Sequence, residues 1–177
     1  MELKTERLVI RRIVEDDWRA IRDIWQDFNM SPYAQYDMPH CTEDNDVRTR
    51  IEKWASAVSS TEHMFFAVCL GRTFIGYVVF HIRENGYETG YCFHSRYQGK
   101  GYAKEATSAL LNYLSKLGVT RITAGTALDN APSVRLLESL GFALIEREKV
   151  SFYKDDDGND IVFEGGIFEL VLNKMQK

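Results

Sequence analysis

Three apolar segments follow one another between residues 64 and 95, and only short glycine-containing turns separate them. Their sequences are MFFAVCL, TFIGYVVFHI and YETGYCFHS, which are rich in the β-branched and aromatic residues that favour strands. The separators at 71–72 and 84–86 are too short for a crossover, so each strand must pair antiparallel with the next. The sequence therefore predicts three consecutive antiparallel strands, and the remaining elements have to pack around this unit.

Helices and further strands are predicted on both sides of this unit. A strand at 8–13 precedes two amphipathic helices, in which apolar residues recur at helical spacing. The order β-α-α-β-β-β-α-β-α-β-β predicts an α/β protein, with helices packed on a mixed sheet in a single domain spanning 1–177. The later elements are a helix at 101–116, a strand at 119–127, a helix at 130–140 and strands at 143–153 and 161–172.

Charge and composition speak against several classes of function. The chain has 177 residues and a formal net charge of -4, and its basic residues are scattered, which is atypical of a nucleic-acid binder. The N-terminus lacks an apolar signal region, and the longest apolar stretch, 64–70, is too short to cross a bilayer. The three cysteines show no CxxC spacing, so we expect reduced thiols in a cytoplasmic protein without membrane or nucleic-acid partners. The four histidines lack metal-ligand spacing, and no metal is expected.

Two glycines stand in SRYQGKGYAKEA at 95–106, directly after the third central strand and before a predicted helix. Gly99 and Gly101 give the backbone access to dihedral angles that other residues rarely adopt. Backbone N–H groups at such a junction, together with the helix dipole, can bind an anion, and Arg96 or Lys100 would add positive charge. The spacing matches neither a P-loop nor the Rossmann fingerprint. A simple turn with a glycine cap is the structural alternative.

The segment RYQGKG at 96–101 resembles the [QR]xxGx[GA] acetyl-CoA loop of the GNAT acyltransferases, within the strand, loop and helix of GYCFHSRYQGKGYAKEA. NAPSVRLLESLGF at 130–142 resembles the second hallmark of this superfamily, an asparagine at a helix start and a terminal Gly-Phe. TERLVIRR and MPHCTED resemble the branch that includes ribosomal-protein-alanine N-acetyltransferases. The resemblance spans nearly the whole chain and implies a GNAT-like fold, in which a central, partly splayed and mainly antiparallel sheet is flanked by helices.

The resemblance also implies where acetyl-CoA, the expected cosubstrate, binds. Backbone amides of residues 98–103 would hold the pyrophosphate, and the backbone of residues 93–95 would pair with the pantetheine as an added strand. Asn130 would contact the pantetheine or fix the turn into its helix. The implied cofactor-binding residues are Phe93, His94, Ser95, Arg96, Gln98, Gly99, Lys100, Gly101, Tyr102, Ala103, Asn130 and Ser133.

For catalysis, the resemblance implies a base that deprotonates the acceptor amine and an acid that protonates the departing thiolate. Glu88 matches the family position of the base; its alternative role is that of a solvent-facing carboxylate. In many family members this acid is a tyrosine in the second-motif helix, but this chain has Leu137 at that position. Ser133, where the resembled branch has a serine, would replace the tyrosine, unless it is an ordinary residue of the first helical turn. Tyr36 and His40 are expected to line the acceptor pocket.

The leading hypothesis is an acetyl-CoA-dependent N-acetyltransferase, in which a primary amine attacks the thioester directly in a ternary complex. The acceptor would be a protein N-terminus or a small-molecule amine, and the enzyme would be a monomer or a homodimer. A non-catalytic CoA-binding sensor with the same fold is the alternative, since Leu137 replaces the tyrosine. A nucleotide-binding module unrelated to CoA is a third hypothesis.

Overall fold

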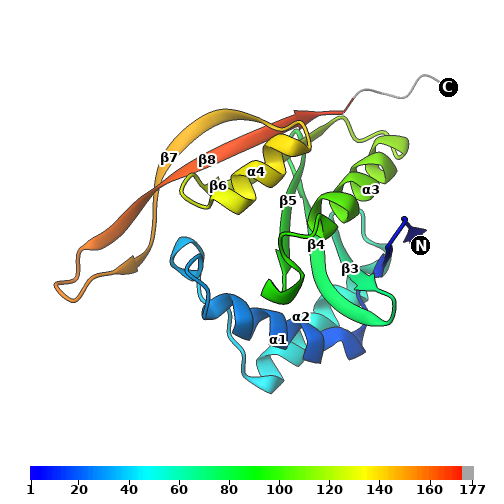
Figure 1. Cartoon of the computed structure of the whole chain (residues 1–177), viewed down its shortest axis with the longest axis horizontal. Coiled ribbons are helices and arrows are strands. Elements are labelled where there is room, and N and C mark those ends of the chain that lie inside the picture. The colour runs from blue at the N-terminus through cyan, green and yellow to red at the C-terminus, as the bar shows by residue number, and fades with distance from the viewer. Residues whose placement is uncertain (173–177) are drawn as a thin grey trace.

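A computed structural model describes residues 1–172 of the chain (Figure 1). The strands are β1 (Glu2–Lys4), β2 (Leu8–Arg12), β3 (His63–Leu70), β4 (Thr73–Arg83), β5 (Gly86–Phe93), β6 (Arg121–Ala127), β7 (Ala143–Lys154) and β8 (Asp160–Val171). The helices are α1 (Trp18–Asn29), α2 (Asp44–Ser56), α3 (Tyr102–Lys116) and α4 (Ala131–Ser139), with 3-10 turns η1 (Glu15–Asp17), η2 (Ala34–Tyr36), η3 (Ala57–Ser59) and η4 (Ser95–Tyr97). Within residues 1–172, every helix is too short or too polar to span a membrane.

All eight strands belong to one sheet, in the spatial order β1-β2-β3-β4-β5-β6-β8-β7. Neighbours pair antiparallel except β5 and β6, which pair in parallel at Tyr87 with Ile122 and at Glu88 with Thr123. Beyond these positions the two strands diverge (Figure 1). The predicted α/β class and the splayed, mainly antiparallel sheet are therefore confirmed. The sequence analysis missed β1, because its three residues are too few and too polar to show a strand pattern.

The helices cover both faces of the sheet. In β3, Met64, Phe66 and Val68 enter the core beneath α3 and α4, while Phe65 and Ala67 enter the core beneath α1 and α2. A strand that is buried on both faces has no need for alternating polar residues. This explains why the segment after residue 63 is a continuous apolar run.

The hairpin of β7 and β8 extends away from the body of the molecule (Figure 1). Its side chains contact the turn between α1 and α2. The Tyr153 hydroxyl donates to the carbonyls of Asp37 at 2.7 Å and Ala34 at 3.1 Å, and the Phe163 ring packs edge-on against Tyr36 at 5.3 Å. These contacts fix the hairpin and the turn relative to each other across the open side of the sheet.

Candidate functional site: a cleft between two diverging strands

A cleft of about 810 Å³ opens where β5 and β6 separate. The glycine loop and the first turn of α3 bound one end, and the start of α4 bounds one flank. The η2 turn and the β7–β8 hairpin bound the other end. The cleft therefore has the size of a typical ligand pocket, about 300–1,000 Å³.

Most of the predicted site residues line this cleft. They are Tyr36, Glu88, Phe93, Ser95, Gln98, Gly99, Gly101, Tyr102, Ala103, Asn130 and Ser133. Among the described residues, four predicted ones fall outside the lining: His40, His94, Arg96 and Lys100. His94 instead accepts a hydrogen bond from the Arg96 N–H at 3.3 Å, within the η4 turn. His40 lines a smaller, neighbouring cavity.

The glycine loop has the geometry of an anion cradle. Gly99 and Gly101 adopt φ angles of 72° and 80°, which side chains disfavour. The first intrahelical bond of α3 runs from the Glu105 N–H to the Gly101 carbonyl at 3.0 Å. The N–H groups of Tyr102 and Ala103 belong to the first turn of α3, where the helix itself offers no acceptor. Main-chain donors and the positive end of the helix dipole thus meet at the cleft, and this donor set fits the phosphates of CoA.

The cationic side chains near the loop differ from those predicted. Lys100 folds back, and its Nζ donates to the Arg96 carbonyl at 2.9 Å. Lys104 and Arg135 line the cleft instead. Lys104 could have been predicted from the sequence, because it lies in the first turn of the predicted helix, next to the glycine loop. Arg135 could be placed only once α4 was known to flank the cleft.

Backbone groups of each of residues 93–95 already have partners inside the chain. Gln98 Nε2 donates to the Phe93 carbonyl at 2.8 Å, and the His94 N–H donates to the Ile75 carbonyl at 3.1 Å. Asp27, on α1, accepts from both the N–H and the hydroxyl of Ser95 at 2.7 Å. The part of β5 that has no β6 partner lies before these residues in the chain, between residues 88 and 93.

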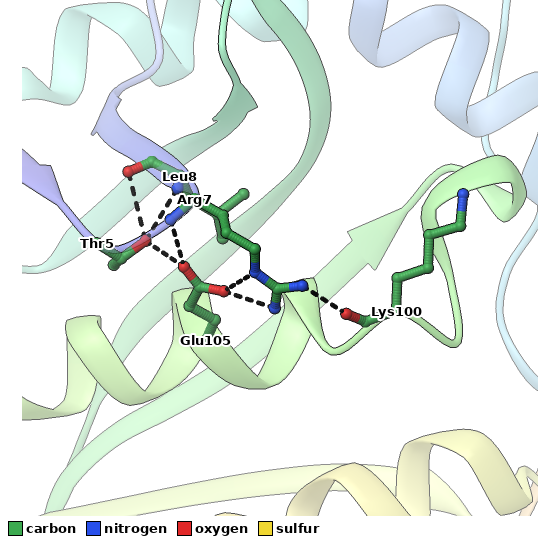
Figure 2. A network of polar contacts seen from close by, with 5 residues as sticks. All are labelled: Thr5, Arg7, Leu8, Lys100 and Glu105. Atoms are coloured by element: carbon green, nitrogen blue, oxygen red, sulfur yellow. Dashed lines mark hydrogen bonds and ion pairs between the residues drawn. The ribbon is translucent and has the colours of Figure 1, made fainter.

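A clamp joins the chain's N-terminal hairpin to the glycine loop (Figure 2). The guanidinium of Arg7 pairs with Glu105 at 2.6 Å and donates to the Lys100 carbonyl at 3.0 Å. Thr5 Oγ1 and the Arg7 N–H donate to the other Glu105 oxygen at 2.5 and 3.0 Å. Partial burial alone would raise the pKa of Glu105, but these hydrogen bonds and the Arg7 charge lower it below its usual value. The clamp lies beside Gly101, where a Cβ would come within 3.4 Å of Arg7 Nη2, while a Cβ at Gly99 would meet nothing within 4 Å.

Tyr91, which was not predicted as a site residue, enters the cleft from β5. The Tyr91 hydroxyl on β5 lies 2.8 Å from Ser133 Oγ on α4. Asn130 caps α4 by accepting from the Ser133 N–H at 3.3 Å. Burial raises the pKa of Tyr91 to about 12, although the hydrogen bond with Ser133 opposes this shift, so the hydroxyl is protonated at neutral pH. Leu137, at the position of the missing tyrosine, is 1% exposed and belongs to the core beneath α3 and α4.

Glu88 lies at the last position where β5 pairs with β6, and the cleft begins there. Its carboxylate pairs with Arg83 on β4 at 2.5 Å, yet the side chain remains 41% exposed. The residue is thus both oriented by a cation and open to the cleft. Its predicted role as a base is compatible with this position.

Cys92 lies beside the cleft as a neutral thiol. Burial raises its pKa to about 12, which disfavours the thiolate that a nucleophile needs. Across residues 1–172, no group of three or more His, Cys, Asp or Glu side chains is placed to hold a metal ion.

Comparison with known proteins identifies the family. The model of the acetyltransferase (GNAT) domain matches residues 7–143. The uncharacterized N-acetyltransferase YnaD of Bacillus subtilis is 32% identical over 144 residues, covering 80% of this chain and 82% of YnaD. A solved GNAT-family acetyltransferase from Bacillus anthracis is 27% identical, with a TM-score of 0.76 and coverage of 97% of this chain and 98% of that one.

A more distant structure shares the fold. The ribosomal L7/L12 α-N-protein acetyltransferase RimL, solved in complex with coenzyme A, has a TM-score of 0.86 at 16% identity, covering 99% of this chain and 100% of RimL. Fold and cleft together are those of an acetyl-transferring enzyme. More narrowly, the chain belongs to the GNAT acetyltransferase family, as an N-acetyltransferase.

The clamp generates a prediction about stability. Replacing Glu105 with Gln should lower the free energy of unfolding by about 1.5–3 kcal/mol at neutral pH, the range for hydrogen bonds to a charged group. The lowered pKa of Glu105 stabilises the fold above the unfolded carboxyl pKa of about 4.3, and this contribution disappears as the pH falls through the folded value. Urea unfolding between pH 7 and pH 3 should therefore show the wild type and variant converging in acid. Glu138→Gln, an exposed carboxylate on α4, is the control; an identical pH dependence in both variants would contradict the clamp's contribution.

Proposed function

We propose that the protein transfers the acetyl group of acetyl-CoA to a primary amine, which attacks the thioester directly in a ternary complex. The observation that carries this proposal is the glycine loop. Two left-handed glycines lead into the N-terminus of α3 at the mouth of a cleft made by diverging strands. This arrangement suits a long ligand with phosphates at one end and a reactive group deep between the strands.

The cofactor site we propose uses backbone more than side chains. N–H groups of residues 99–103 would bind the pyrophosphate, whereas the Gln98 N–H already donates to the Ser95 carbonyl at 3.1 Å. Lys104 and Arg135, which line the cleft, would add positive charge. The pantetheine would run along the edge of β5 that β6 has left unpaired and would bond to it as an extra strand does. Acetyl-CoA would supply the activated acetyl group there.

Glu88 would act as the base. Amines are mostly protonated at neutral pH, with pKa values of about 8 for an α-amine and about 10.4 for lysine, so a proton must leave before attack. Glu88 would accept this proton directly or through water. A bond then forms between the amine nitrogen and the carbonyl carbon, the nitrogen releases its second proton to water, and the carbon–sulfur bond breaks.

Ser133 would protonate the departing thiolate. A serine hydroxyl alone is a weak acid, but the Tyr91 hydroxyl lies 2.8 Å from Ser133 Oγ and can donate to it. This hydrogen bond would make the serine a better donor and would orient its proton towards the cleft. Tyr91 on β5 would thus support the role that a tyrosine on the second-motif helix has in many family members, where this chain has Leu137 on α4.

The acceptor would be a protein N-terminus or a small-molecule amine. RimL, which shares the fold, is named as an acetyltransferase of a ribosomal protein's α-amine. Away from the glycine loop, the cleft is lined by the carboxylates of Asp37, Glu88 and Glu148, which would attract a cationic amine. Thiol release from acetyl-CoA with an amine would separate this enzyme from a CoA-binding sensor.

The cofactor site is tested by thermal unfolding with ligand. Acetyl-CoA at a hundredfold excess over Kd should stabilise the wild type by about 2.7 kcal/mol, and ATP should stabilise it far less. Gly101→Val should weaken acetyl-CoA binding, because its Cβ would approach Arg7 Nη2 to 3.4 Å and its φ of 80° disfavours a side chain. Gly118→Val is the matched control, since Gly118 has a φ of 89° at the other end of α3 with nothing within 4 Å. Equal affinity in both variants, measured by calorimetry, would overturn the loop assignment.

The base is tested by Glu88→Gln. Turnover should fall by about a hundredfold, the lower range for loss of general base catalysis, while the Kd for acetyl-CoA stays unchanged. Glu84→Gln, an exposed carboxylate at the turn between β4 and β5, should leave turnover unchanged. If Glu88→Gln keeps both the wild-type rate and its pH profile, Glu88 is not the base.

The hydroxyl pair is tested by Tyr91→Phe. We expect turnover to fall by about tenfold or more without a change in KM for acetyl-CoA, because only protonation of the thiolate is impaired. Tyr87→Phe is the control: Tyr87 is on the same strand, and its hydroxyl donates to the Thr61 carbonyl at 2.7 Å. Wild-type turnover in Tyr91→Phe would show that Ser133 acts without the tyrosine.

A further inference from the structure

A side pocket of about 210 Å³ adjoins the cleft on the face of the sheet covered by α1 and α2. Cleft and side pocket share Phe28, Asp37 and the β5 residues 90–92 in their walls. Gly90 contributes no side chain at this junction. A single water needs only about 10–15 Å³ of such volume, so the side pocket has room for a chemical group of several atoms.

Aromatic rings form most of the side pocket. His40 stacks on Trp25 at 5.0 Å and contacts Phe28 at 5.3 Å, and Trp54 meets Trp25 edge-on at 5.9 Å. The Trp25 N–H donates to the Tyr77 hydroxyl at 2.8 Å in the buried part of the wall. These two polar groups satisfy each other, so the wall favours an apolar occupant.

Charge also discriminates between occupants. Of the described residues that line the side pocket, Asp37 and Arg50 alone carry a formal charge. Asp37 stands at the junction with the cleft, whereas Arg50 lines the side pocket only, with its guanidinium over the Trp25 ring at 5.4 Å. Burial lowers the pKa of His40, Asp37 opposes the shift and Arg50 adds to it, so His40 is neutral at neutral pH. A cation in the side pocket would be repelled by Arg50, while a cation at the junction would be attracted by Asp37.

We propose that the side pocket receives a neutral, preferably aromatic, substituent of the acceptor, while the acceptor's amine stays in the cleft near Asp37. This proposal rests on the proposed function and names the acceptor class: a primary amine that carries an apolar group a few atoms away. His40, predicted to line the acceptor pocket, would contact this group and not the amine. An aromatic ring would find offset-stacked or edge-to-face partners on Trp54 and His40, whereas Trp25 is only 1% exposed.

The experiment compares three primary amines as acceptors, with free thiol as the readout. 2-Phenylethylamine carries a neutral ring, 1,4-diaminobutane a second cation, and 4-aminobutyrate an anion. For the wild type, we expect kcat/KM for 2-phenylethylamine to exceed that for either of the others by about tenfold or more, equivalent to about 1.4 kcal/mol. Ethylamine, which has no substituent to place, measures transfer without the side pocket.

Charge reversal then tests the pocket itself. Arg50→Glu should shift the kcat/KM ratio of 1,4-diaminobutane to 2-phenylethylamine by about tenfold towards the diamine, since a like charge becomes an opposite one. Arg50→Met, which removes the charge without reversing it, should give a smaller shift. Arg48→Glu is the matched control: Arg48 lies on the same helix over the Trp18 ring at 4.9 Å, outside the side pocket, and should give no shift.

The outcomes separate the two proposals. If all four amines fail to release thiol, the side-pocket inference is wrong, whereas the proposed function fails only if peptides with a free N-terminal amine also release no thiol. If ethylamine reacts but 1,4-diaminobutane or 4-aminobutyrate is the best acceptor, the proposed function stands and the inference is wrong. Equal shifts in Arg50→Glu and Arg48→Glu would likewise overturn the inference, because the effect would then come from overall charge.

Discussion

The early end of the pairing between β5 and β6 is the constraint on which the rest of the site depends. After Glu88, β5 keeps its antiparallel partner β4 as far as Phe93, while β6 keeps β8 as its partner as far as Ala127. β5 thus stays with β4 and β6 stays with β8, because these pairings are longer than the one between β5 and β6, and the two halves of the sheet separate. Backbone groups that lose a ladder partner need another one, which makes the open edge of β5 a site for an extended ligand. The cleft is therefore produced by two intact pairings that pull apart.

Positive and negative groups both line this cleft. The N–H groups of the glycine loop, the α3 dipole, Lys104 and Arg135 supply the positive charge, while Asp37, Glu88 and Glu148 supply carboxylates away from the loop and Asp27 supplies one beside it, bonded to Ser95. An anionic cosubstrate and a cationic acceptor would each meet complementary charge, and would approach from different sides. Direct transfer between two substrates needs this separation, because both must be bound at once. The contact of Tyr153 with the η2 turn holds the hairpin against this side of the cleft.

The sequence predicted the elements well where a local pattern specified them. The three apolar runs became β3, β4 and β5, and Gly99 and Gly101 adopted the left-handed conformations that their spacing indicated. Features that depend on tertiary contacts were missed. Lys100 bonds to its own loop, and Tyr91 meets Ser133 only because β5 and α4 are brought together. His40 entered a second cavity because its ring stacks on Trp25, fifteen positions earlier in the chain. Periodicity locates elements, but it does not say which side chains meet across them.

The clamp between Arg7 and Glu105 joins residues that are 98 positions apart in the chain. Contacts between such distant residues form late, because a long stretch of polypeptide must be ordered before they are gained. During synthesis on the ribosome, the N-terminal hairpin is made first and waits, without this partner, until α3 has emerged. The glycine loop consequently acquires its final support only when more than half of the protein has been translated, and a nascent fragment that ends before α3 lacks it altogether.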